Sequence, residues 1–250
     1  MVVDYLERGV LAGSIAGLAY GAYMALVANP LIGYMEGVAE GGVGDHAHEH
    51  AHAAVDGGPV VTEATTAAVS VGGGVLWGIL LGGVFALAFY FLEPALPGRG
   101  KAKAYVLAGA GFFTVSVAPW LVLPPTTPGA EQAYTPTLRI AIYVGMMAVG
   151  AVVAAASIYG YDRVSARSRP LGAVAAAVPI VALAALTALG APTIVAAGAV
   201  PADLATAFRG LTVLSQGALW ALVAGCFGWF QTQAGVRSAA ERRDELLTSP

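Results

Sequence analysis

Every histidine of the 250-residue chain falls in one short stretch, at alternate positions between residues 45 and 52. Two carboxylates lie in the same stretch. Imidazole is the commonest metal ligand among side chains, and in an extended chain alternate side chains project to the same side. Several imidazoles could therefore surround one ion. The predicted metal-ligating residues are His46, His48, His50, His52, Asp45 and Glu49.

The ligand types limit which metals such a site would take. Imidazole with carboxylate suits cobalt, nickel, copper and zinc, and affinity alone favours copper without identifying the physiological metal. Because only the neutral imidazole binds metal, we expect capture to weaken below about pH 6. The alternative interpretation is a solvated polar loop whose histidines bind metal incidentally.

The same stretch matches the H-E-x-x-H pattern of zinc metalloproteases at His48, Glu49 and His52. That chemistry needs both histidines one turn apart on a rigid helix, with a third ligand in a cleft. Here the pattern lies in a stretch rich in glycine and alanine, and the remaining histidines are its immediate neighbours. We therefore expect that the protein is not an enzyme.

The composition places the chain in a membrane. Hydrophobic residues make up 58% and charged residues 11%, against about 25% charged residues in an average soluble domain. Six charge-free intervals are each long enough to cross about 30 Å of hydrocarbon as a helix, whereas a membrane β-barrel would show shorter segments of alternating polarity. The sequence predicts an all-α, polytopic protein with six transmembrane helices, near residues 9–28, 69–92, 104–122, 139–160, 172–190 and 210–230.

The basic residues predict the orientation of these spans. Ten of the twelve lie on one side of the six-span arrangement, and only Arg139 and Arg209 lie on the other. The positive-inside rule makes the basic side cytoplasmic. We therefore predict a multi-pass cell-membrane protein with cytoplasmic N- and C-termini and an extracellular or periplasmic histidine-rich loop.

The predicted organisation is one transmembrane domain, residues 1–236, followed by a cytoplasmic tail, 237–250. The external loop is expected over residues 36–63, which carry six carboxylates and no basic residue. Its frequent glycines favour a mobile segment over a packed one. Its negative charge would also attract cations.

Small residues and prolines mark the predicted spans. Glycines recur at every fourth position in the first span, from Gly9 to Gly21, and in the second, from Gly74 to Gly82. This spacing lines one helix face with small residues and lets two backbones approach closely. The alternative, functional interpretation is a thin-walled pore along the contact between these two glycine-lined faces. Pro119 and Pro179 are expected to kink the third and fifth spans.

Charged groups are missing from the middle of the predicted spans, which argues against an autonomous proton-coupled pump. No glycine-rich phosphate-binding motif is present, so any ATP coupling would come from another chain. The single cysteine, Cys226, lies in an apolar run and is expected to be a small apolar filler. The polar candidates inside the spans, each also readable as a packing contact, are Ser116, Tyr143, Ser157, Ser215 and Gln216.

Three further motifs follow one another along the chain. The first span ends in Asn29-Pro30-Leu31-Ile32, a proline-rich segment covers residues 119–129, and Arg139 with Tyr143 opens the fourth span. Together with the histidine-rich loop, these motifs make most of the chain similar to the CbtA family of cobalt transporter subunits.

The chain departs from that family pattern at several positions. Leu123, Thr126 and Thr127 stand where Tyr, Asn and Pro are common in the family, and Asn29 stands where an acidic residue is common. A ligand role for these positions is therefore not expected here. Arg139 is expected as an interface anchor, with a gate at the outer mouth as the alternative.

The resemblance implies a membrane subunit for uptake of a divalent transition metal, first of all cobalt, with nickel, zinc or copper as alternatives. It also implies a small CbtB-like membrane subunit as a partner, beside lipid and the metal ion. The competing interpretation is a metal-binding sensor or accessory subunit without transport of its own. A net charge of −3 indicates no nucleic-acid partner.

Overall fold

The computed structural model describes residues 2–41, 63–128, 130, 134–190 and 200–248, and every regular element among them is helical. Six stretches are long and apolar enough to cross a membrane, as predicted. The α-helices are α1 (Val2–Tyr23), α2 (Asn29–Gly41), α3 (Glu63–Leu92), α4 (Lys101–Phe112), α5 (Ala118–Trp120), α6 (Pro136–Ser165), α7 (Arg169–Gly190) and α8 (Ala202–Thr248). Two π-helices, η1 (Met24–Ala28) and η3 (Phe113–Val117), and a 3-10 turn, η2 (Glu93–Ala95), complete the described elements.

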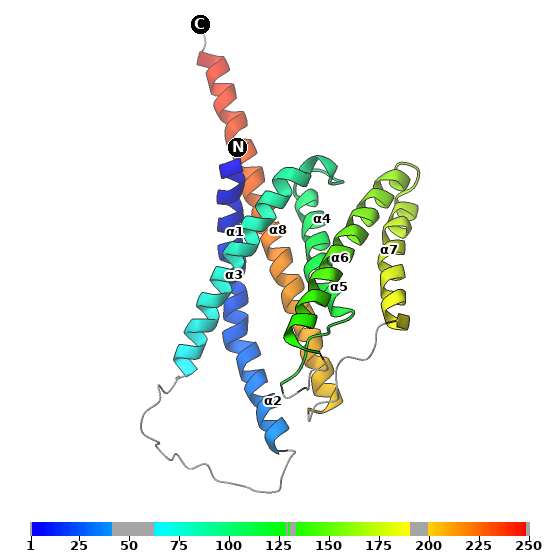
Figure 1. Cartoon of the computed structure of the whole chain (residues 1–250). Coiled ribbons are helices and arrows are strands. Elements are labelled where there is room, and N and C mark those ends of the chain that lie inside the picture. Colours follow the sequence, from blue (N-terminus) through cyan, green and yellow to red (C-terminus); the bar gives the residue numbers. More distant parts are fainter. Residues whose placement is uncertain (1, 42–62, 129, 131–133, 191–199, 249–250) are drawn as a thin grey trace.

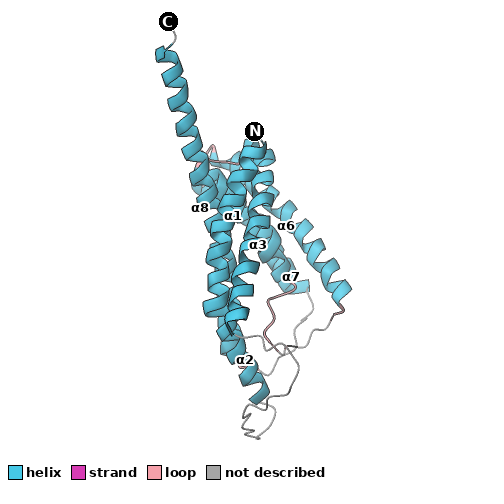
Figure 2. Ribbon diagram, turned by 90° about the vertical axis from the view of Figure 1, so that its left-hand side faces the viewer, coloured by secondary structure: helices cyan, strands magenta, loops and turns pink. Residues whose placement is uncertain are grey.

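The helices run between two ends of an elongated bundle (Figures 1 and 2). At one end lie the start of α1, the turn between α3 and α4, and the turn between α6 and α7, and α8 projects beyond them. We call this the basic end, because it holds Arg8, Arg99, Lys101, Lys103, Arg163, Arg167 and Arg169. The end of α2 and the starts of α3, α6 and α8 lie at the opposite end.

Several helices extend further than the sequence predicts. The first span continues through η1 and α2 to Gly41, and α3 already begins at Glu63, so the connection between them is shorter than the predicted loop 36–63. The prediction was wrong for residues 36–41, where the charge at Glu36 and the glycines indicated a loop. The predicted tail also begins as helix, because α8 continues without a break to Thr248.

Two prolines are accommodated by π turns. Each π-helix ends two residues before a proline, η1 before Pro30 and η3 before Pro119. A proline has no N–H for the carbonyl four residues earlier, and its ring clashes with that carbonyl. One hydrogen bond shows the wider π turn: the Ala118 N–H donates to the Phe113 carbonyl, five residues earlier instead of four. Around Pro179, by contrast, α7 remains an α-helix.

The glycines of α1 and α3 face one another along an antiparallel seam, as their spacing predicts. Added Cβ atoms would collide with the backbone of the other helix, and one on Gly17 would lie 2.9 Å from the Gly78 Cα. The glycine seam consists of Gly9, Gly13, Gly17, Gly21, Gly74, Gly78 and Gly82. Because the two backbones touch along its length, the alternative of a pore through this seam is wrong.

A buried cluster joins α1, α3, α4 and α8 into a core. At its centre Phe227 is fully buried, and its ring packs edge-on against Phe85 and Phe89 at 5.4 and 5.0 Å between centroids. The helices α6 and α7 pack mainly against each other and form a hairpin at one side of the bundle (Figure 1). A smaller cluster around Phe113 and Leu183 attaches this hairpin to η3 and α5.

Candidate functional site

The predicted metal ligands lie outside the described residues. His46, His48, His50, His52, Asp45 and Glu49 fall between Gly41 and Glu63, where α2 ends and α3 begins at the opposite end of the bundle. Both the metal site and the helical spacing that a metalloprotease would need at His48 and His52 therefore remain untested. Among the described residues, no group of three or more His, Cys, Asp or Glu side chains could hold a metal ion.

Inside the bundle, Tyr143 compensates for a defect that Pro119 creates. In a regular α-helix the Val115 carbonyl would accept a hydrogen bond from residue 119, but proline has no N–H to donate. The Tyr143 hydroxyl of α6 donates to this carbonyl at 2.7 Å. An unpaired backbone group is unfavourable in lipid, so this bond both satisfies the Val115 carbonyl and ties the hairpin to the core.

Tyr143 also borders a small pocket within the bundle, which we call the central pocket. Its volume is about 180 Å³, and it brings together three of the five polar residues singled out in the sequence. The pocket is lined by Trp77, Leu81, Val115, Ser116, Trp120, Tyr143, Gln216 and Trp220. These residues come from α3, η3, α5, α6 and α8, so five elements contribute to one polar site.

Gln216 connects the central pocket to the first span. Its amide nitrogen donates to the Tyr20 hydroxyl at 2.9 Å, which joins α8 to α1. Both residues lie near the middle of their membrane-spanning segments, Ala202–Val236 and Val2–Ala39. The pair therefore places uncharged polar atoms at a depth where polar groups usually mark a helix contact or a solute path.

The chemistry of the central pocket is that of neutral donors and acceptors. No charged side chain lines it, while three indole rings surround hydroxyl and amide groups. Aromatic faces attract cations, and hydroxyl and amide oxygens accept hydrogen bonds from water. The pocket can therefore hold several water molecules, at about 30 Å³ each, or a hydrated cation.

The two remaining polar candidates lie elsewhere. Ser215 donates to the Thr212 carbonyl of its own helix at 3.0 Å, a local contact. Ser157 is 7% exposed, and its hydroxyl has no hydrogen-bond partner among the described residues. It lines a separate pocket of about 330 Å³ between α4, α6 and α7.

Polar contacts also support the motifs at the opposite end. Arg209 donates to the Pro125 carbonyl at 3.3 Å and so holds the proline-rich segment against α8. Asn29 donates to the Ser70 hydroxyl at 2.8 Å, which joins the first span to α3 just beyond the glycine seam. Arg209 rather than Arg139 thus contacts the proline-rich segment. The sequence analysis did not predict this role for Arg209. The only sign of it in the sequence is that Arg209, like Arg139, lies on the side of the spans that has few basic residues.

Comparison with known families agrees with this architecture. The model of one family, described as "Probable cobalt transporter subunit (CbtA)", matches residues 2–232. Searches of curated proteins and of solved structures gave no significant match. The family match covers five of the six spans completely and the sixth, Ala202–Val236, up to residue 232, and the chain therefore belongs to the CbtA family.

Proposed function

We propose that the protein is the membrane subunit of an uptake system for divalent cobalt, and that residues 45–52 capture the metal outside the cell. The observation that carries this proposal is the family match over residues 2–232, whose description is that of a transporter subunit and not of an enzyme. The substrate also suits the imidazole and carboxylate groups of the histidine stretch, which suit nickel, zinc and copper as well.

The distribution of charge supports an outward-facing histidine stretch. The basic end holds seven basic residues and the starts or ends of five helices, while α2 and α3 approach residues 42–62 from the opposite end. The positive-inside rule favours a cytoplasmic basic end. A negatively charged segment on the outside would raise the local concentration of divalent cations before they enter the bundle.

The central pocket is our candidate for part of the path through the bundle. It offers hydroxyl, amide and indole groups, and the Tyr20–Gln216 pair extends these polar groups toward α1. Neutral groups of this kind can accept hydrogen bonds from the water shell of a hydrated cation. Passage would then need the indole rings to move aside.

A specific observation also favours the second candidate, a metal-binding sensor or accessory subunit without transport of its own. No charged side chain lines the central pocket, and charged groups are the usual mark of an ion pathway in a membrane. The family description contains the word subunit, which implies a partner. A small CbtB-like membrane protein would be that partner.

Metal flux into proteoliposomes distinguishes the two candidates. The full chain is reconstituted alone and with a CbtB-like partner, and entry of cobalt, nickel and zinc is followed with an internal metal-sensitive dye. We expect cobalt entry above that of protein-free liposomes in at least one preparation. Histidine-dependent binding without entry in either preparation would contradict transport and support the sensor.

A further inference from the structure

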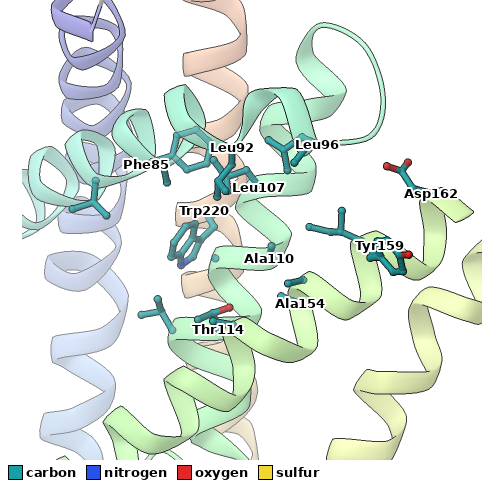
Figure 3. Close-up of a pocket in the computed structure, with 18 residues that line it drawn as sticks. Phe85, Leu92, Leu96, Leu107, Ala110, Thr114, Ala154, Tyr159, Asp162 and Trp220 are labelled. Atoms are coloured by element: carbon teal, nitrogen blue, oxygen red, sulfur yellow. The ribbon is translucent and has the colours of Figure 1, made fainter.

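A larger pocket lies at the basic end, between the α6–α7 hairpin and the core. Its volume is about 550 Å³, within the range of about 300–1,000 Å³ that is typical of sites for small molecules. Figure 3 shows its wall of apolar side chains from α3, α4 and α6, with the Trp220 ring of α8 at one side. We call it the interhelical pocket. Asp162, at its rim, is the one charged residue in its lining.

The depth of the interhelical pocket matches one leaflet of a bilayer. On α6 its lining runs from Ala151 to Asp162, which is about 16 Å at about 1.5 Å per residue. The hydrocarbon core of a membrane is about 30 Å thick. The pocket therefore extends from Asp162 at the basic end about half-way across the bilayer, to Ala151 on α6 and Val115 on η3, as a cavity for an acyl chain would.

Two cations contact residues at or next to the lining of the interhelical pocket, one on α6 and one on α4. The Arg163 guanidinium lies over the ring of Tyr159, which lines the pocket, at 5.5 Å from its centroid, and donates to its hydroxyl at 3.1 Å. On α4, the Lys103 ammonium donates to the Glu93 carbonyl at 2.7 Å, at the start of the turn that contributes Ala95 to the lining. The two rim segments, 93–103 and 159–169, together carry six basic and two acidic residues.

We propose that the interhelical pocket binds one anionic phospholipid of the leaflet at the basic end. Its acyl chain fills the apolar cavity, and its phosphate lies between Lys103 and Arg163. Basic pockets between transmembrane helices are known to bind anionic head groups. The neighbouring pocket beside Ser157 shares Ile158 with the first and is also lined by Pro97 and Gly98, which leaves room for the second chain.

The half-membrane depth favours a lipid over a helix from another subunit. A transmembrane helix needs about 20 residues to cross the full hydrocarbon thickness, and it would fill a groove along the whole bundle. The opening at the basic end and its excess of basic residues instead suit a molecule with an apolar chain and an anionic head. The interhelical pocket shares Val115 and Trp220 with the central pocket, but the lipid proposal stands even if the protein only binds metal.

Native mass spectrometry of the purified full-length chain tests the proposal. The protein is incubated with equal amounts of phosphatidylglycerol and phosphatidylcholine that carry identical acyl chains. We expect one retained phosphatidylglycerol in preference to phosphatidylcholine. Arg163→Gln should lower this preference about fivefold, the effect of one basic group near an anionic lipid. Equal retention of both lipids, or no retained lipid, would overturn the proposal.

A matched pair of substitutions locates the bound lipid. Ala155 and its neighbour Ala156 are both exposed, but only Ala155 lines the interhelical pocket. Ala155→Trp should fill the cavity and abolish lipid retention, and Ala156→Trp should leave retention unchanged. Size-exclusion profiles and thermal unfolding establish that each variant is folded. If Ala155→Trp does not fold, the Arg163→Gln arm decides the outcome. Equal lipid retention by the two folded tryptophan variants would contradict the assignment.

Discussion

Small residues have opposite effects on helix packing on the two sides of this bundle. Along the glycine seam the backbones of α1 and α3 touch, and almost no added atom could be accommodated. On the other side, α6 presents Ala151, Ala154 and Ala155 to α3 and α4, yet an open pocket of about 550 Å³ separates them. Small side chains thus let two backbones touch where both helices supply them in register. Elsewhere they leave space that lipid or ligand can fill.

The largest expected effect comes from breaking the glycine seam. Gly78→Ala places a Cβ against the Gly13 carbonyl, so the helices must separate, and we expect a loss of about 3 kcal/mol in the free energy of unfolding. The control is Gly83→Ala on the same helix, where a Cβ has nothing within 4 Å. There alanine should be neutral or slightly stabilising because of its higher helix propensity. Thermal unfolding in detergent compares the two variants. Equal unfolding midpoints would contradict the close contact of α1 and α3 at the glycine seam.

The next effect concerns the bond that ties the hairpin to the core. Tyr143→Phe removes the donor to the Val115 carbonyl and should cost about 1 kcal/mol. The reason is specific to Pro119, so the cost should shrink in a Pro119→Ala background, where residue 119 regains its N–H. A double-mutant cycle on thermal stability measures this coupling. Additive effects would show that Tyr143 does not compensate for the proline.

On α6, at the loosely packed side of the bundle, one substitution should increase the stability of the protein. The Ser157 hydroxyl is buried without a partner among the described residues, and an unsatisfied buried group is destabilising. Ser157→Ala should therefore stabilise the protein by up to about 1 kcal/mol. The control is Ser215→Ala, which removes a hydrogen bond within α8 and should not stabilise. Destabilisation by Ser157→Ala would indicate a partner, such as bound water or lipid.

The smallest effect is expected at the hydrogen bond between Tyr20 and Gln216, a residue that lines the central pocket. Interhelical hydrogen bonds in membrane proteins contribute about 0.6 kcal/mol on average. Tyr20→Phe and Gln216→Leu should each cost roughly that amount, and together little more than either alone. If the central pocket carries the ion, Gln216→Leu should also slow cobalt entry far more than its effect on stability explains. Unchanged flux would exclude this residue from the path.

Much of the architecture was predictable from the sequence because a bilayer imposes few solutions. Six charge-free intervals predicted six spans, and the four-residue spacing of the glycines predicted the close contact of the first two. The ends of the helices were less predictable. The first segment, Val2–Ala39, has 38 residues, more than about 30 Å of hydrocarbon requires, and nothing in a charge count shows that a helix continues beyond the membrane.

The central pocket was predictable only in part. The rarity of polar residues in the spans singled out Ser116, Tyr143 and Gln216, which the structure brings together. Trp77 and Trp220 could not be assigned to the same pocket, because helices that are apolar on all sides carry no pattern that shows which face meets which neighbour. Which carbonyl accepts the Tyr143 hydrogen bond was also not predictable, because it depends on how α6 packs against η3 in the tertiary structure.

Cobalt uptake as a function of external cobalt concentration tests most directly the claim that the histidine stretch captures metal for transport. The comparison uses wild type, a variant with His46, His48, His50 and His52 changed to Ala, and a control with Ala47, Ala51, Ala53 and Ala54 changed to Ser. We predict that only the histidine variant loses uptake at low concentration and recovers it at high concentration. Wild-type uptake at low concentration should fall below about pH 6, as the imidazoles become protonated. Identical concentration curves for all three proteins would contradict the account.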